Sequence, residues 1–488
     1  MRKGKRIHSF ILYSILFALF MGLGLPTVVQ ASESNAKKGT AQNPYIITTD
    51  ITYPPFEFQN DKKEYVGIDA DIINAIAKDQ GFEIEFRPLN FSAGLQALEA
   101  NQVDGMISAM SINPEREESF DFSDPYYEAG TVMAISENNK EIQSYDDLNG
   151  KTVAVKVGTT GATFVEKLQE KYSIKVNQFE DSATMYQDVV SGHSDAVFDD
   201  YPVMAYAIQQ GLKLQLPLEP EKGDVYGFAV NKGQNAELLD MFNTGLANIK
   251  EDGTYDNIID QYLDSDEKGS QNGFFALIQK NWRELLNGLS KTLLLTVISF
   301  AIALLFGVVL GFFAASPYAI LRGISRLYVT IMRGLPMLVL AFFIYFSIPE
   351  LLNIKLTAFI AGVATLTLSS AAYISEQVRG GIEAVSGGQL EAARSLGMSY
   401  GKSMVRVVIP QAIKIMIPSL INQFVITLKD TSILSIIGIV ELTQAGKIII
   451  ARTYSSGSMW IIIGLIYILI ITFLTWLSTF IERKMINA

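Results

Sequence analysis

Residues 264–273 read DSDEKGSQNG, and the chain changes its character on either side of this stretch. The segment is short, polar and rich in Gly, Ser and acidic side chains, as linkers between domains are. A chain of 488 residues is also too long for a single core. We therefore place a linker at residues 265–283, a soluble domain at 44–264 and a membrane domain at 284–488.

Charge is divided unevenly between the two parts. From residue 269 onward, 17 Lys and Arg stand against 8 Asp and Glu, whereas the whole chain has a net charge of −11. The preceding part therefore carries −20. An acidic soluble part joined to a basic apolar part is typical of a membrane protein with basic cytoplasmic loops. No nucleic acid partner is expected, because the soluble part has no basic patch of sufficient size.

Five apolar runs of about 20 residues or more predict five transmembrane helices in the lipid bilayer. They lie near residues 290–315, 325–350, 356–376, 413–440 and 459–481. Basic residues gather in alternate connections and in the tail: Arg322, Arg326, Arg379, Arg394, Lys402, Arg406, Lys414, Arg483 and Lys484. Loops rich in Lys and Arg stay inside the cell, so the C-terminus is expected in the cytoplasm. An odd number of spans then places the soluble domain outside a multi-pass protein of the cell membrane.

The first 31 residues have the three parts of a secretory signal peptide. MRKGKR is basic, residues 7–25 are apolar, and Val29-Gln30-Ala31 resembles a cleavage site. Cleavage after Ala31 is the preferred interpretation, and an uncleaved membrane anchor is the alternative. Residues 32–43 are polar and are expected to form a disordered leader.

Two amino-acid counts exclude several kinds of chemistry. The chain has no Cys and two His, His8 and His193. Disulfides, thiol catalysis and Cys-ligated zinc are therefore excluded, and a His metal site or a Ser-His-Asp triad is not expected. We predict no metal site and no cofactor in this chain.

The soluble domain alternates short β-rich runs with helical ones. YIITT, FEIEFRPL, TVAVKVG and DAVFDD predict strands, and VGIDADIINAIAKDQG predicts a helix. This alternation indicates parallel sheets covered by helices, in two blocks near 44–131 and 132–225. The run Tyr226–Val230 (YGFAV) is interpreted as a strand that returns to the first block.

Two loops offer groups that suit a free amino acid, which presents an ammonium, a carboxylate and a side chain. Residues 50–58 (DITYPPFEF) end a strand in an aromatic loop stiffened by proline. Asn113-Pro114 then predicts a helix start with Arg116 in its first turn, where a guanidinium and backbone N–H groups could bind a carboxylate. The alternative is an ordinary helix N-terminus with a solvated Arg.

The motifs YPPFEF, VGIDADI, NFSAGLQAL, SAMSINPERE, FDFSDPYYEAG, DLNGKTVAVKVGTTG and DAVFDD occur in this order across residues 44–263. Together they resemble the polar amino-acid binding proteins, and the glutamine-binding type most. The resemblance implies an α/β bilobed periplasmic-binding-protein fold, with two lobes joined by two crossover strands. An all-α membrane domain of five transmembrane helices would follow it.

The same resemblance implies roles for individual residues. Tyr53 and Phe91 would stack on the ligand side chain. Arg116, with Ser111, would hold the α-carboxylate, and Asp200 would hold the ammonium.

Asp50 and Lys156 would bind the side-chain amide by the same resemblance, because an amide offers both a donor and an acceptor. Asp50 as a turn former and Lys156 as a solvated side chain are the alternatives. Thr160, in the Gly158–Gly161 turn, would offer backbone N–H groups from the second lobe. This turn lacks the Gly-Lys-Ser/Thr ending of a phosphate loop.

Three positions differ from the glutamine-binding type. Asp199 replaces a His, Tyr53 replaces a Phe, and Ala109, next to Ser108 in the binding loop, replaces a Gly. An extra carboxylate at Asp199 should disfavour an anionic ligand side chain, unless it turns outward.

The membrane part contains residues 388–397, GQLEAARSLG, followed by a hydrophobic-Pro pair at Ile409-Pro410. This stretch resembles the EAA signature of importer-type ABC permeases, which forms a coupling helix against a cytoplasmic ATPase. The residues that carry the resemblance, and would contact the ATPase, are Glu391, Ala392, Ala393, Arg394 and Gly397.

Two further features resemble elements of amino-acid permeases, the run Arg333-Gly334-Leu335-Pro336 and the pair Lys429-Asp430. The pair lies inside an apolar run, where ionisable groups face a partner or a water-filled path. It could line the substrate pathway or form a structural pair.

We interpret the chain as the substrate-binding and permease subunit of an ATP-driven importer for a polar amino acid. Glutamine is preferred, with glutamate and asparagine left open. The chain has no Walker A sequence, so it is no enzyme, and a separate ATPase and a second copy of this chain are the expected partners. The alternatives are a ligand-gated channel, which would need a filter such as TVGYG, and an enzyme on the binding-protein fold.

Overall fold

The structure is a computed structural model that describes residues 37–486 except 61, 264–272, 353 and 355. The predicted signal peptide lies outside the described residues, as do 32–36 of the leader and most of the polar stretch at 264–273. Residues 37–43 of the leader form turns, with the Gly39 and Thr40 N–H groups donating to the Asn43 carbonyl. The ordered domain therefore begins before the predicted residue 44.

Lobe 1 is built on a five-stranded sheet with the order β5-β1-β6-β14-β7. The first strand, β1, is the β-branched run YIITT, and it pairs in parallel with β5 and β6. The strands are β1 (Tyr45–Thr49), β5 (Ile84–Pro88), β6 (Gly105–Met106), β7 (Phe120–Phe122) and β14 (Ala229–Asn231). The helices are α2 (Ile68–Gln80), α3 (Phe91–Glu99), α4 (Pro114–Ser119), α8 (Ala236–Glu251) and α9 (Thr254–Leu263). A small sheet of β2 (Thr52–Tyr53), β3 (Glu57–Gln59) and β4 (Tyr65–Val66) carries the aromatic loop.

Lobe 2 is built on a second sheet with the order β10-β9-β11-β8-β12, and β13 pairs with β8. Its strands are β8 (Tyr127–Ser136), β9 (Thr152–Lys156), β10 (Lys175–Phe179), β11 (Ala196–Asp200), β12 (Leu214–Gln215) and β13 (Glu221–Tyr226). Its helical elements are η1 (Tyr145–Leu148), α5 (Thr160–Gln169), α6 (Ser182–Val190) and α7 (Tyr201–Gln209). Parallel β9, β10 and β11 end at one edge of this sheet, which faces lobe 1.

The chain crosses between the lobes twice, from β7 into β8 and from β13 back into β14. The strands β8 and β13 pair antiparallel from Tyr127↔Tyr226 to Thr131↔Glu221, so the two crossings lie side by side. The predicted bilobed fold with two crossover strands is confirmed. The return strand predicted at 226–230 is this second crossing.

The membrane part is helical. Its elements are α10 (Phe274–Ala314), α11 (Ala319–Gly334), α12 (Met337–Phe342), η2 (Phe343–Ser347), α13 (Ile348–Leu352), α14 (Ala358–Glu383), α15 (Gly387–Ser395), α16 (Tyr400–Ser403), η3 (Met404–Val408), α17 (Ile409–Asp430), η4 (Thr431–Ile437), α18 (Leu442–Thr453) and α19 (Ser456–Ile486). Among the described residues, four helices are long and apolar enough to cross a membrane, or five if one bent pair counts as a span. Residues 274–283, predicted as linker, are the first turns of α10.

The span predicted near 325–350 corresponds to the bent pair, Ala319–Gly334 and Met337–Leu352. Helices α11 and α12 meet there at 103°. Pro336 has no N–H for a helix and disfavours helical backbone at the residue before it. Leu335 accordingly has extended backbone angles, with φ −92° and ψ 128°.

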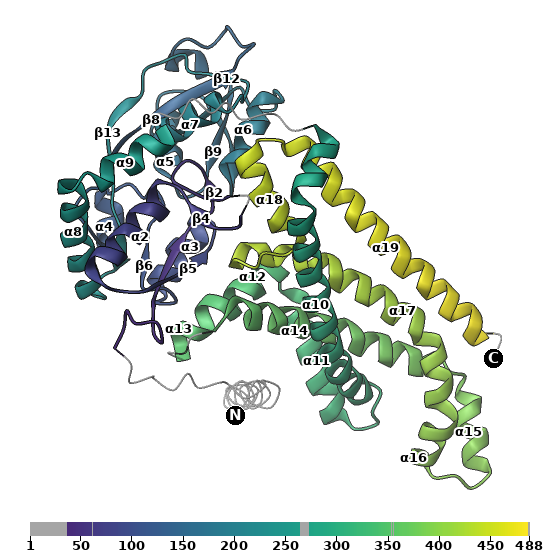
Figure 1. The fold of residues 1–488 in the computed structure, drawn as a ribbon. Helices are drawn as coiled ribbons and strands as arrows, with labels where there is room; N and C mark the ends of the chain where they lie inside the picture. The colour runs from purple at the N-terminus through teal and green to yellow at the C-terminus, as the bar shows by residue number, and fades with distance from the viewer. Residues whose placement is uncertain (1–36, 61, 264–272, 353, 355, 487–488) are drawn as a thin grey trace, which may run out of the picture.

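Close helix packing in the membrane part depends on glycine. Gly307 and Gly311 lie one turn apart on α10, and a Cβ at either would come within 2.8 Å of α14 atoms around Ile374 and Val378. Small residues at this spacing let two membrane helices approach closely. Figure 1 shows the binding domain against one end of the helical part, near α18, and α15 and α16 at the opposite end.

Candidate functional site

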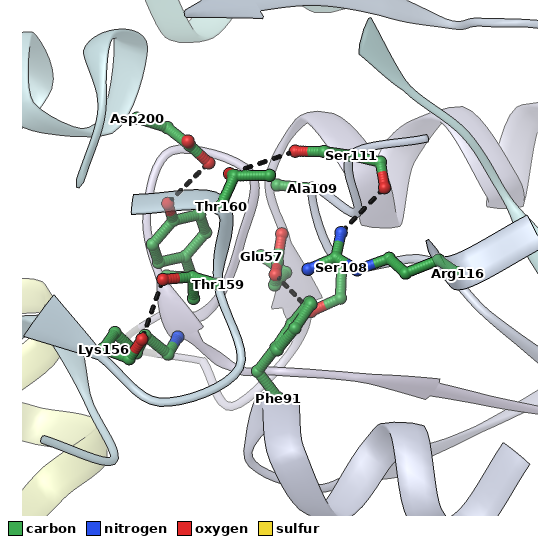
Figure 2. A pocket seen from close by; sticks show the side chains of 11 residues that line it. Glu57, Phe91, Ser108, Ala109, Ser111, Arg116, Lys156, Thr159, Thr160 and Asp200 are labelled. Carbon is green, nitrogen blue, oxygen red and sulfur yellow. Dashed lines mark hydrogen bonds between the residues drawn. The ribbon is translucent and has the colours of Figure 1, made fainter. Parts of the chain in front are cut away.

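A cavity lies between the two lobes, where the ends of the parallel strands face each other. Nine of the eleven residues predicted to bind a ligand line it: Tyr53, Phe91, Ser108, Ala109, Ser111, Arg116, Lys156, Thr160 and Asp200. Glu57 and Thr159 complete the lining, and Figure 2 shows these side chains converging from both lobes. Asp50 and Asp199 do not line the cavity; they lie behind it.

Arg116 is positioned by the start of α4. The Asn113 side chain caps this helix by accepting from the Arg116 N–H at 2.9 Å, with Pro114 in the first turn. The guanidinium donates to the Ser111 carbonyl at 2.7 Å and, across the cleft, to the Gly158 carbonyl at 2.9 Å. Its five donors leave others for a carboxylate. The predicted helix start with Arg116 in its first turn is therefore present.

Asp200 ends strand β11 on the opposite side of the cavity. Its Oδ2 accepts from the Tyr226 hydroxyl at 2.6 Å and from the Tyr53 hydroxyl at 2.9 Å. Burial, followed by the repulsion of neighbouring Asp199, raises the pKa of Asp200 to about 7. An ammonium beside this carboxylate would relieve both effects, so Asp200 is suited to bind one.

Lys156 and Asp50 form a buried ion pair across the cleft, with Nζ 2.7 Å from Oδ2. The Lys156 ammonium also lies over the Tyr53 ring, 4.5 Å from its centroid. Burial lowers the pKa of Lys156, but the attraction of Asp50 outweighs it, and the net shift is upward. The Asp50 carboxylate thus already balances the charge of the Lys156 ammonium that lines the cavity. Of the two alternatives for Lys156, the solvated one is excluded by its burial.

Asp199 points away from the cavity. Its Oδ2 accepts from the Ser182 and Tyr186 hydroxyls of α6 at 2.9 and 2.6 Å. Its Oδ1 accepts from the Tyr53 hydroxyl at 2.7 Å and from the Asp200 N–H at 2.9 Å. The Tyr at position 53 and the carboxylate at 199, both departures from the glutamine-binding type, therefore hydrogen-bond each other. The effect of Asp199 on a ligand is therefore indirect, whereas Tyr53 lines the cavity.

Two hydroxyl groups join the lobes, since the Ser111 and Thr160 oxygens lie 3.3 Å apart, and Figure 2 marks this contact. Thr160 begins α5, and the Thr159 side chain caps this helix. The helix therefore aims its free N–H groups at the cleft. The predicted turn at Gly158–Gly161 heads a helix, as expected.

Ala109 has φ +43°, an uncommon conformation for any residue but glycine. Its N–H donates to the buried Asp69 carboxylate at 2.6 Å, which fixes the backbone there. Ser108 is held beside it, with its hydroxyl donating to Glu57 at 2.7 Å and accepting from the Asp50 N–H at 3.2 Å. The Asp69 carboxylate thus holds the backbone in the conformation that Ala109 must adopt in place of Gly.

Glu57 and Thr159 line the cavity and were not predicted. Burial, followed by the repulsion of Asp69, raises the pKa of Glu57 well above its ordinary value. Glu57 belongs to the aromatic loop at residues 50–58, but nothing in the sequence of that loop indicates that its carboxyl group is buried. Thr159 could have been found as the cap of the predicted helix.

The second predicted site, the coupling loop, forms helix α15. Glu391, Ala392 and Arg394 are exposed on it, whereas Ala393 is buried. Gly397 follows the helix at φ +80°, which a side chain rarely adopts, so this glycine shapes the turn. Leu396 is 84% exposed beside it. The loop therefore presents a short charged helix with one apolar side chain away from the binding domain.

Lys429 and Asp430 end helix α17. Because they are consecutive, their side chains leave the helix in directions about 100° apart. Lys429 is exposed in the single chain and Asp430 is half-buried. This geometry does not favour a direct pair between them. Among the described residues, no cluster of His, Cys, Asp or Glu is arranged to hold a metal ion.

Two protein families match this chain, one in each of its two parts. Residues 45–265 match the bacterial extracellular solute-binding proteins, family 3, and residues 307–487 match the binding-protein-dependent transport system inner membrane component. The arginine transport system permease protein ArtQ of Bacillus subtilis is 36% identical over 201 residues, which cover 41% of this chain and 92% of that protein. The glutamine transport system permease protein GlnP of Escherichia coli is 33% identical over 202 residues, again 41% and 92%. A solved ancestral arginine-binding protein bound to glutamine is 37% identical, covers 47% of this chain and 100% of its own, and has a TM-score of 0.44.

Proposed function

Because this chain belongs to the binding-protein-dependent transport permeases, with a family 3 solute-binding domain fused in front, we propose that it imports glutamine. The binding domain captures the amino acid between its lobes and delivers it to the membrane part. A separate ATPase supplies the energy. The membrane part belongs to the permeases, and nothing in it supports the channel alternative.

The observation that carries the choice of ligand is the charge arrangement of the cavity. Arg116 and Asp200 face it from opposite lobes, which suits the carboxylate and the ammonium of a free amino acid. The remaining cation, Lys156, is paired with Asp50 at 2.7 Å. A neutral amide can accept from Lys156 without disturbing this pair.

Charged side chains fit this cavity less well. The guanidinium of arginine would meet the Lys156 ammonium, and the carboxylates of Asp50 and Asp199 are already hydrogen-bonded. The carboxylate of glutamate would compete with Asp50 for Lys156. Asparagine has the same amide but is one methylene shorter, which is worth about 1–3 kcal/mol in a fitted pocket. Glutamine is therefore our first choice and asparagine the second.

Coupling to the ATPase is assigned to helix α15. Its exposed Glu391, Arg394 and Leu396 offer charges for orientation and an apolar contact for affinity. It lies at the end of the molecule opposite the binding domain, where a cytoplasmic subunit would bind (Figure 1).

We infer that two copies of this chain together form the functional membrane unit. Lys429 is exposed in the single chain inside an apolar span. A cation at that depth is expensive unless it faces water or a partner. A second copy would enclose a water-lined path beside it.

Titration calorimetry on the purified full chain with glutamine, asparagine, glutamate and arginine tests the ligand. We expect glutamine to bind at least tenfold more tightly than glutamate or arginine. Lys156→Met keeps the side-chain length and removes the charge. It should reduce the difference in affinity between glutamine and arginine. Tighter binding of arginine than of glutamine by the unaltered chain would contradict the proposal.

A further inference from the structure

Helix α18 joins two membrane spans, yet it lies against the binding domain. It packs on the permease through two glycines: a Cβ at Gly288 of α10 would come within 2.9 Å of Leu442, and one at Gly446 within 2.1 Å of Ile463. The helix is therefore fixed to the membrane part. Its other side faces the small sheet of lobe 1 and helix α6 of lobe 2, as Figure 1 shows.

Lys447 contacts lobe 2. Its Nζ lies 3.7 Å from Oδ2 of Asp181, and both side chains are mostly buried. Asp181 caps α6, with its other oxygen accepting from the Thr184 N–H at 2.9 Å. The same helix supplies Ser182 and Tyr186, which hold Asp199 behind the cavity.

Arg452 contacts lobe 1. Its guanidinium donates to the backbone carbonyls of Gln59 and Asn60 at 3.4 and 3.2 Å. It is held in place by Glu284 of α10, at 2.9 Å. Gln59 ends β3, which pairs with the strand that carries Tyr53, a wall of the cavity.

A third contact lies just before α18. Gly438 has φ +82°, and a Cβ there would lie 2.5 Å from the Pro88 carbonyl. Pro88 and Leu89 precede Asn90 and Phe91, and Phe91 is another wall of the cavity. Each of these three contacts therefore reaches an element that also carries or supports a wall of the ligand site.

The two lobes are closed on each other in this structure. Lys156 pairs with Asp50, Tyr53 bonds to Asp199 and Asp200, and Arg116 reaches Gly158, all across the cleft. Opening of a bilobed domain moves one lobe relative to the other about its hinge strands. A rigid helix that contacts both lobes can keep both contacts in only one arrangement of the lobes.

Building on the proposed function, we infer that α18 is the element through which the permease registers closure of its own binding domain. Lys447 is the positioning residue for lobe 2, and Arg452 is the one for lobe 1.

The test uses the full chain reconstituted with its ATPase subunit, and it measures both L-glutamine affinity and glutamine-stimulated ATP hydrolysis. Lys447→Met and Asp181→Asn each remove the ion pair, and Asn retains the helix cap. We expect each to leave the glutamine Kd within threefold while reducing the stimulation at least fivefold. The double variant should be no worse than either single one, because paired residues are not additive. Lys447→Arg should retain the stimulation.

The matched control is Lys213→Met. Lys213 pairs with Glu137 at 3.8 Å within lobe 2, away from α18, and its loss should change neither measurement. Unchanged stimulation in Lys447→Met and Asp181→Asn would overturn the inference, as would a Kd weakened more than tenfold in both. The proposed function fails separately, if the unaltered chain binds no glutamine or shows no glutamine-stimulated hydrolysis.

Discussion

At the scale of single residues, Arg116 and Asp200 face one cavity from opposite lobes. Removing one member of a buried charge pair costs roughly 2–5 kcal/mol, because the partner charge stays buried. At about 1.4 kcal/mol per factor of ten, this is on the order of 30-fold to several thousand-fold in affinity. Arg116→Ala and Asp200→Ala should therefore nearly abolish glutamine binding in a calorimetric titration. Binding by Arg116→Ala within threefold of the unaltered chain would contradict the assigned clamp.

The titration of Asp200 predicts a pH dependence. Its pKa is raised to about 7 by burial and by Asp199. Because an ammonium pairs only with the ionised carboxylate, protons and ligand compete for it. We expect the glutamine Kd to level off near pH 8 and to rise by up to about tenfold per unit as the pH falls below 7.

Tyr226→Phe provides the matched variant for this titration. The Tyr226 hydroxyl donates to Asp200 at 2.6 Å and thereby favours the ionised form. Its removal should raise the pKa of Asp200 further and move the onset of weak binding to higher pH. A Kd that stays flat from pH 5 to pH 8 in both proteins would rule out this role for the carboxylate.

At the scale of elements, a local signal placed one residue of the ligand site, and the resemblance to the amino-acid binding proteins implied the others. Asn113 and Pro114 predicted the start of α4, and with it Arg116, because capping is a property of neighbouring residues. The orientation of Asp199 was left open, since it depends on hydroxyls of α6 that are 13 and 17 residues away. The side of α18 that meets the binding domain had no local signal either. Arg452 and Gln59, which meet there, are separated by 393 residues.

The prediction at this scale concerns the contact of helix α15 with the ATPase subunit. Gly397 is a poor site for a probe, because its φ of +80° would strain any side chain by roughly 1–2 kcal/mol. Leu396 is 84% exposed and can be changed without disturbing the fold of the chain. Leu396→Asp should leave the glutamine Kd unchanged and should weaken copurification of the ATPase subunit and glutamine uptake at least tenfold. Normal uptake by this variant would remove α15 from the coupling interface.

At the scale of the whole molecule, the binding domain and α15 lie at opposite ends of the helical part. The basic residues predict which end is cytoplasmic, and the chain has no Cys, so single cysteines can report it. Ser399→Cys, beside α15, should react with a membrane-impermeant thiol reagent only in permeabilised cells.

Gly457→Cys is the partner probe at the other end, where a side chain meets nothing within 4 Å. It should be labelled in intact cells. Ser455 is less suitable, because it is half-buried beside Tyr454, which packs on the binding domain. The reverse labelling pattern of the two cysteines would invert the assigned orientation.

The central claim, that this chain couples capture of glutamine to ATP-driven import, is tested most directly by transport in proteoliposomes. Vesicles would hold the full chain and its ATPase subunit, with the binding domain outside and ATP enclosed. We predict accumulation of labelled L-glutamine above its external concentration, only when ATP is enclosed, and its loss in Arg116→Ala. Equilibration of glutamine without accumulation, at the same rate with and without ATP, would contradict the claim and would indicate a channel instead.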